Sequence, residues 1–190
     1  MAAPRLIIAV FGIALSLASS QAIARDFKIG GGITISLSDN WSGTFMQNPA
    51  MKFAGVKEMV DDATEARLRG QGSGVLVSYM KFKSDKPPSE IKTNDGETVR
   101  KNAMQVYSAQ AVETDPVATV RRDGDVVRAF VTLHAKPGSR FNVAGGYPGG
   151  CVTSGTIRLG VAVHSISIAS DSCESAAHLE AVTAIFGPAQ

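Results

Sequence analysis

The stretch GGCVTSGTIRLGVAVHSISIASDSC, residues 149–173, contains the only two cysteines of the chain, Cys151 and Cys173. Its middle alternates apolar and polar side chains, which is typical of a half-buried β-strand. One long strand would separate the cysteines by far more than the roughly 7 Å between Cα atoms that a disulfide tolerates. A bend at Gly160 would instead make two strands and bring the cysteines together. The sequence therefore predicts a hairpin that bends at Gly160, unless the Gly149–Gly150 loop folds back.

The beginning of the chain, residues 1–24, has the three-part layout of a secretory signal peptide. Arg5 precedes an apolar run of about 13 residues, and small residues with an Ala-x-Ala motif follow. This run is shorter than the roughly 20 residues needed to span a bilayer, which favours cleavage over a membrane anchor. Cleavage is expected after Ala24, with the site after Ala22 nearly as good. Residues 25–190 are then expected to form one globular domain, periplasmic or secreted.

Export decides how the two cysteines are interpreted. Two thiols in an oxidising compartment usually form one disulfide, so Cys151 and Cys173 are expected to pair. Closing that loop is worth about 3 kcal/mol by loop entropy. The alternative is a nucleophilic Cys151 with His164 or His178 as its base, because a cysteine after a glycine-rich loop is a common nucleophile context. Export and the second cysteine favour the disulfide.

Charge and histidine spacing argue against several classes of function. The full chain has a net charge of +2, and its lysines and arginines are scattered rather than clustered, so no nucleic-acid partner is expected. The three histidines lack a paired ligand spacing such as H-x-x-x-H, so neither a metal nor a cofactor is predicted. No segment after the signal is apolar enough to span a membrane.

Hydrophobic periodicity predicts three helices. One covers Pro49–Arg69. A second covers Glu97–Ala111, where a strand is the alternative interpretation. The third ends at Phe186; Asp171 and Glu174 suggest a capping box at its start, and the expected apolar stripe is Leu179, Val182, Ile185 and Phe186.

The remaining segments predict strands and turns. Alternation at Ile33–Leu37 indicates a strand, which three glycines precede and which Trp41 follows as an expected core anchor. The run Val75–Phe82 is a candidate central strand. Asp123-Gly124 is the favoured dipeptide of a hairpin turn, placed between Val117–Val120 and Val126–His134.

Two of these segments resemble a known family. The residues Ile33-Thr-Ile-Ser-Leu-Ser-Asp-Asn-Trp41 and the closing strand-then-helix from Val161 to Phe186 are similar to small exported domains of the PsbP/Mog1-like type. The resemblance implies a mixed antiparallel sheet flanked by helices, and an accessory or binding role rather than an enzymatic one. It consists of polarity patterns, so it implies no functional residue.

The expected architecture is an α+β single domain, a single antiparallel sheet with two or three helices packed on one face. The expected function is that of a non-catalytic periplasmic or secreted accessory protein that binds another protein or a small ligand. The alternative is a thiol-dependent hydrolase or transferase that uses Cys151 with His164 or His178. The sequence does not separate the accessory protein from a third possibility, a host-directed effector or an inhibitor. The sequence identifies no particular ligand or partner and no oligomeric state.

Overall fold

The computed structural model describes residues 24–47, 60–82, 94–143 and 147–188, which form eleven strands and two helices. The strands are β1 (Ala24–Lys28), β2 (Thr34–Ser38), β3 (Ser42–Gln47), β4 (Val60–Gly70), β5 (Ser73–Phe82), β6 (Thr119–Asp123), β7 (Val126–His134), β8 (Phe141–Val143), β9 (Tyr147–Gly149), β10 (Cys151–Leu159) and β11 (Ala162–Ser170). The helices are α1 (Asp95–Tyr107) and α2 (Ala176–Phe186).

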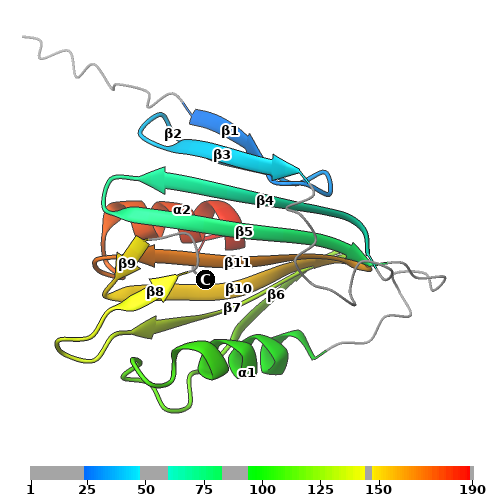
Figure 1. Ribbon diagram of the computed structural model, residues 1–190. Helices are drawn as coiled ribbons and strands as arrows, with labels where there is room; N and C mark the ends of the chain where they lie inside the picture. The colour runs from blue at the N-terminus through cyan, green and yellow to red at the C-terminus, as the bar shows by residue number, and fades with distance from the viewer. Residues whose placement is uncertain (1–23, 48–59, 83–93, 144–146, 189–190) are drawn as a thin grey trace, which may run out of the picture.

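Seven strands form one antiparallel sheet in the order β3-β4-β5-β11-β10-β7-β6 (Figure 1). The pairs β1-β2 and β8-β9 form two further sheets, so the prediction of a single sheet is wrong. Between β1 and β2, Gly30, Gly31 and Gly32 all have positive φ, a conformation that glycine adopts without steric cost. The chain therefore reverses tightly, and β2 pairs with β1.

The hairpin of β10 and β11 lies within the seven-stranded sheet and confirms the predicted bend. Leu159 pairs with Ala162 across the turn, and Gly160 has a φ of 58°. The same register places Cys151 opposite Ser170. The chain thus returns to the first cysteine three residues before it reaches the second.

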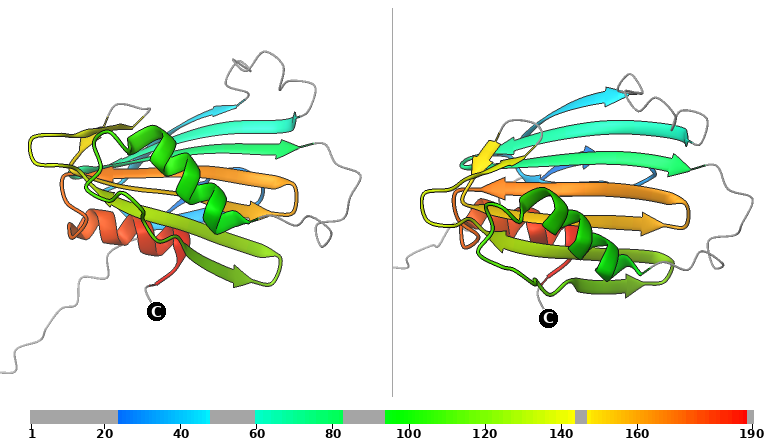
Figure 2. Two further views of the ribbon diagram at one scale, coloured as in Figure 1. Left: turned by 90° about the horizontal axis from the view of Figure 1, so that it is seen from below. Right: turned by 60° about the horizontal axis from the view of Figure 1, so that its bottom comes forward.

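The two helices lie on opposite faces of the large sheet, α1 in front of it and α2 behind it in the right-hand view of Figure 2. In β7, Val131 belongs to the apolar cluster beneath α1, whereas the Phe130 ring stacks on Phe186 of α2 at 4.7 Å. The prediction that two or three helices share one face is therefore wrong. Because the central strands carry apolar side chains on both faces, each face needs its own cover.

The predicted helix Pro49–Arg69 is wrong over its second half, since Val60–Gly70 form β4. Its first half lies outside the described residues. In β4 the exposed Arg67 and Arg69 alternate with the buried Ala66 and Leu68, which is the period of a strand. Pairing with β5 along its length supplies the hydrogen bonds that override local helix preference.

Helix α1 confirms the helical interpretation of Glu97–Ala111, although it ends at Tyr107. The side chain of Asn94 caps it by accepting a hydrogen bond from the Glu97 amide. A buried ion pair fixes its first turn to the sheet, because Arg158 of β10 donates two hydrogen bonds, of 2.8 and 2.9 Å, to Asp95.

Helix α2 begins later than the Asp171–Glu174 pattern predicts, because Ser175 is its N-cap. The predicted stripe is largely confirmed, because Ile185 and Phe186 are buried and Val182 packs against the same core cluster. Leu179 is the exception at 53% exposure, and His178 and Ala181 are buried in addition. None of the helices in the described part of the chain is long and apolar enough to cross a membrane.

The other predicted strands and the Trp41 anchor are present, but the strand predicted at Val117–Val120 lies two to three residues later, at Thr119–Asp123. The turn between β6 and β7 is formed by Gly124 and Asp125, because Asp123 still pairs with Val126. Trp41 is buried, and its indole Nε1 donates a hydrogen bond of 3.1 Å to Glu180 of α2.

Candidate functional site

The sequence-predicted site residues Cys151 and Cys173 lie at bonding distance, with their Sγ atoms 1.94 Å apart and their Cα atoms 5.2 Å apart. Cys151 opens β10 and is completely buried, and Cys173 lies between β11 and α2. The bond therefore ties the start of one central strand to the segment that leads into the last helix. It follows directly from the hairpin register, which returns the chain to Cys151.

His178 lies beside this disulfide and takes part in a chain of buried hydrogen bonds. The Ser170 hydroxyl donates to the Ser172 carbonyl at 2.8 Å, so its oxygen accepts from His178 Nδ1 at 2.7 Å. The other ring nitrogen, Nε2, then accepts from the Thr153 hydroxyl at 2.9 Å. Thr132 donates to Thr153 in turn at 2.7 Å. Because each hydroxyl carries a single proton, every hydrogen bond from Thr132 to the Ser172 carbonyl must donate in the same direction. This fixes the tautomer of the imidazole, with the proton on Nδ1.

Burial makes the imidazole of His178 a neutral group. Loss of solvent lowers its pKa to about 4, while the charges of Glu174 and His134 act on it in opposite directions. The Nε2 atom of His178 lies 3.5 Å from Cys151 Sγ, but that sulfur is bonded to Cys173. The lone pair of Nε2 already accepts the hydrogen bond from Thr153. The cluster in this state is a buried polar network without a thiolate nucleophile.

The other predicted base, His164, is not part of this cluster. It pairs with Ile157 in the sheet, six residues along β10 from Cys151 and hence about 20 Å away at 3.3 Å per residue. Its ring is buried against Tyr79, at 4.7 Å between centroids, and burial lowers its pKa. Nε2 lies 3.1 Å from the Gly30 carbonyl oxygen. His164 thus packs the glycine turn of the β1-β2 hairpin.

The sulfur–histidine cluster has the composition of a metal site but not its chemistry. The ligand atoms of Cys151, Cys173 and His178 lie within 4.8 Å of one another. Metals bind cysteine as the thiolate, and a disulfide offers none. The third histidine, His134, lies at the end of β7, where its Nδ1 is 2.7 Å from a carboxylate oxygen of Glu113. No residue in the described ranges completes a metal centre in this oxidised state.

A second feature, absent from the sequence-based candidates, is a hollow of about 130 Å³ on the α1 face of the large sheet. Cross-strand pairing aligns Ser78, Ser165 and Thr156 in one row over β5, β11 and β10. Ser167 and Ser154 form the next row. We call this hollow the hydroxyl groove; its lining is Leu76, Ser78, Val99, Asn102, Ser154, Gly155, Thr156, Ser165, Ile166 and Ser167.

The hydroxyl groove is uncharged and combines polar side chains with the apolar Leu76, Val99 and Ile166. Its serines and threonine both donate and accept hydrogen bonds, Asn102 of α1 adds an amide, and none of its lining residues is ionisable. A signal for it exists in the sequence, because Ser154, Thr156, Ser165 and Ser167 occupy alternate positions of two strands. Alternation alone identifies them as the polar side of a strand; only the cross-strand register joins them into one surface.

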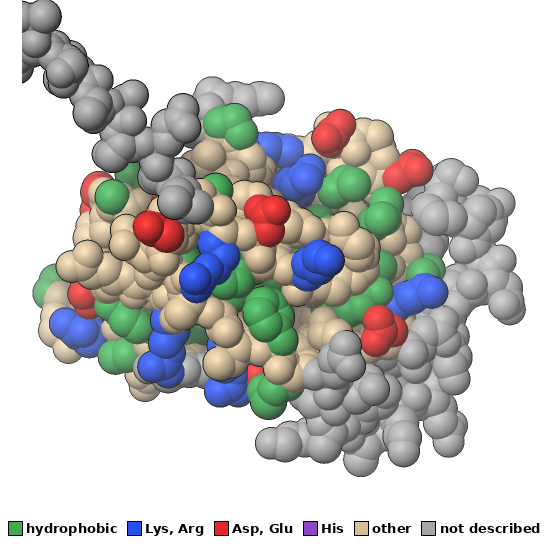
Figure 3. Space-filling view, turned by 90° about the horizontal axis from the view of Figure 1, so that it is seen from above, with side chains coloured by type: hydrophobic (Ala, Val, Ile, Leu, Met, Phe, Trp, Pro, Cys, Tyr) green, Lys and Arg blue, Asp and Glu red, His purple; other side chains and the backbone are tan. Residues whose placement is uncertain are grey.

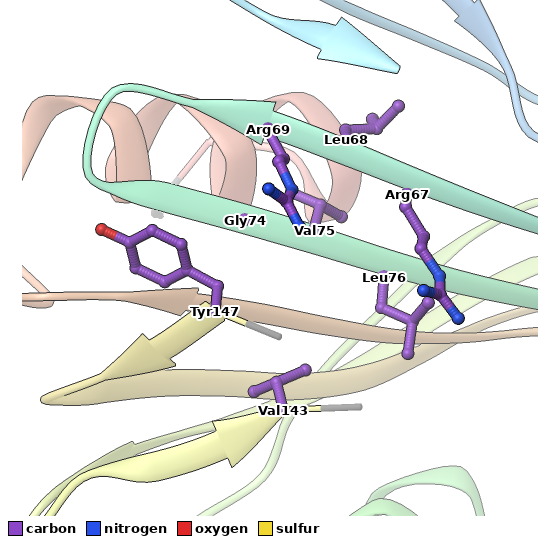
Figure 4. A pocket seen from close by; sticks show the side chains of 8 residues that line it. All are labelled: Arg67, Leu68, Arg69, Gly74, Val75, Leu76, Val143 and Tyr147. Carbon is purple, nitrogen blue, oxygen red and sulfur yellow. The ribbon is translucent and has the colours of Figure 1, made fainter. Parts of the chain in front are cut away.

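A smaller hollow of about 20 Å³, with room for about one water molecule, adjoins the groove at Leu76 (Figure 4). Arg67 and Arg69 border it from β4, and Arg67 bonds Glu65 at 2.7 Å. The Tyr147 side chain closes it over Gly74, where an added Cβ would lie 3.0 Å from Tyr147 Cβ. The hollow is too small to hold a ligand by itself.

Comparisons of the chain with known protein families, with characterised proteins and with solved structures found no match. The PsbP/Mog1-like resemblance therefore stays a prediction. What defines the class of protein is the geometry of its described residues. They form a seven-stranded antiparallel sheet with one helix on each face, a buried sulfur–histidine cluster on the α2 side and an open hydroxyl groove on the α1 side.

Proposed function

We propose that the mature chain, residues 25–190, is a non-catalytic exported binding protein that holds a small polar ligand in the hydroxyl groove. The observation that carries this proposal is the row of Ser78, Ser165 and Thr156, which three strands present to an open hollow. Hydroxyls that line a concave surface orient a ligand by hydrogen bonds without supplying a nucleophile or a charge. The arrangement suits recognition better than catalysis.

The size of the groove limits what it binds. A cavity of about 150 Å³ holds one benzene-sized ring, so a hollow of about 130 Å³ has room for one ring-sized polar group. Drug-sized ligands usually occupy about 300–1,000 Å³. We therefore expect a neutral ligand of the size of a monosaccharide or a short polyol, or one such unit of a longer molecule.

Export is part of the same proposal. The signal-like residues 1–24 and the Cys151–Cys173 pair both fit an oxidising compartment, the periplasm or the exterior. A buried disulfide beside a neutral histidine suits a scaffold that must stay folded outside the cell. Mass spectrometry of the exported protein tests this part, because cleavage after Ala24 or Ala22 determines the N-terminal residue.

A titration followed by amide NMR tests the groove. Neutral monosaccharides and polyols are added to the isotope-labelled mature protein, and we expect amide shifts confined to residues 154–156 and 165–167. Ser165→Leu fills the groove from an exposed position and should abolish these shifts. Thr34→Leu, an exposed hydroxyl on β2 away from the groove, is the matched control. If no compound in the panel moves these amides, or Ser165→Leu binds as wild type does, the groove is not the binding site.

The second candidate function is the thiol-dependent hydrolase or transferase. The 3.5 Å between Cys151 Sγ and His178 Nε2 favours it, since reduction would place a thiol beside a base. A thiol count on the native, unreduced protein separates the two proposals. Two free thiols, with Cys151 reacting fast near neutral pH, would support the enzyme, and no free thiols would end it.

A further inference from the structure

The two edges of the seven-stranded sheet differ in their chemistry. β3 forms one edge and β6 the other, and within the described residues β3 makes ladder hydrogen bonds to β4 alone. An edge strand presents unpaired amide and carbonyl groups, which are a template for another strand. In the right-hand view of Figure 2, β3 lies at the upper margin of the sheet, with the β1-β2 hairpin behind it.

The sequence of β3, SGTFMQ, lacks two of the usual protections of an edge strand. It contains no charge and no proline, and it exposes two large apolar side chains, Phe45 at 50% and Met46 at 43%. The other edge, β6, reads TVRRD and carries three charges in five residues. Charged side chains are a common means of keeping edges apart. Figure 3, which views the β3 side from above, shows hydrophobic side chains exposed between basic and acidic ones.

We propose that β3 pairs with β3 of a second copy of this chain, antiparallel and about a two-fold axis, to join the two large sheets into one. Residues opposite each other in an antiparallel pair point to the same face of the sheet, so the residue at the two-fold axis lies opposite its own copy. For a pairing centred on β3, that residue is Thr44 or Phe45. Neither register places a charge opposite another, because the strand has none. A centred pairing of β6 would instead place Arg121 or Arg122 opposite its own copy.

Packing next to the edge favours the same partner. The Phe45 ring lies 6.4 Å from that of Phe27, which is buried in the core cluster on the α2 face. A second β3 brings another Phe45 or a Gly43 beside this pair and covers the exposed half of the ring. The occupant therefore needs a short uncharged strand with an apolar residue on each face, which a second copy supplies.

Sedimentation velocity on the mature protein tests the dimer between 1 and 300 μM. We expect a species of twice the monomer mass at the high end. Phe45→Lys and Met46→Lys, one on each face of β3, should each raise the dissociation constant at least tenfold. Val120→Lys, which places a lysine at a 41% exposed valine of the opposite edge, is the matched control and should leave it unchanged.

Hydrogen exchange gives a second readout that does not depend on the variants. Half of the β3 amides should become more protected at 300 μM than at 1 μM, while those of β6 should not change. A wild type that stays monomeric over this range overturns the proposal. A dimer that survives both lysine variants, or that dissociates equally in Val120→Lys, overturns it as well. Thermal unfolding of each variant checks that the fold is kept.

Discussion

Replacing His178 with asparagine tests the neutral imidazole at the centre of the buried network. The folded chain holds this ring with a pKa of about 4, whereas an unfolded histidine has one near 6.5. Between these pH values the unfolded chain binds a proton that the folded chain excludes, so stability rises with pH there. The contribution is complete above about pH 6.5 and is lost as the pH falls toward 4.

The size of the effect follows from these two values. Lowering the pH from 7.5 to 4.5 should cost the wild type about 2.5 kcal/mol of unfolding free energy through His178 alone. His178→Asn keeps an amide that can bond Ser170 but cannot take up this proton. Other titrating groups, including the buried His164, are present in both proteins and cancel in the difference.

Urea unfolding at both pH values measures this difference, with the fluorescence of Trp41 as the signal. The variant should be less stable than the wild type at pH 7.5 but should lose about 2.5 kcal/mol less on acidification. Nitrogen chemical shifts of the imidazole supply an independent check, since Nδ1 should carry the proton and Nε2 should not. Equal pH dependence in both proteins, or a ring that titrates near 6.5, would refute the network and its tautomer.

Three further predictions concern single contacts. Replacing both Cys151 and Cys173 with serine should cost about 3 kcal/mol of unfolding free energy, measured in urea against the wild type with and without reductant; a loss below about 1 kcal/mol would contradict the loop argument. Glu180→Ala should cost about 1–3 kcal/mol and shift the tryptophan emission, because the buried indole loses its acceptor; Glu180→Gln should recover part of both. Asp95→Ala should cost about 3–5 kcal/mol of unfolding free energy, because it leaves the Arg158 guanidinium buried without its two hydrogen bonds. Adding Arg158→Met should restore most of that stability, measured in urea. A double variant no more stable than the single one would argue against the ion pair.

Local patterns in the sequence were enough to predict several elements. The bend at Gly160 and the approach of Cys151 to Cys173 follow from one hairpin with short-range pairing. Helix α1 follows from the apolar spacing of Val99 and Ala103, both of which the helix buries. Trp41 lies in the core as its place after β2 predicts. Each of these results depends on periodicity, turn residues or a nearby cysteine, which all act over a few residues.

The failures share a different cause. Val60–Gly70 carries a spacing compatible with a helix, but two neighbouring strands pair with it and make it β4. Both helices were expected on one face, yet the alternation of Phe130 and Val131 gives the sheet two apolar faces, and one helix covers each. A pattern within one segment does not state what will pack on it.

The sequence alone was enough to predict a central disulfide-closed hairpin, because glycine conformation and cysteine spacing act locally. The expectation of export comes from the signal-like layout of residues 1–24 alone. Only the tertiary structure decided that Ser78 lies opposite Ser165 and that Ser165 lies opposite Thr156, and that His178 rather than His164 faces Cys151. Both outcomes depend on the register of strands and on the face that a helix covers. Register is set by the joint burial of residues far apart in the chain, and no single segment encodes it.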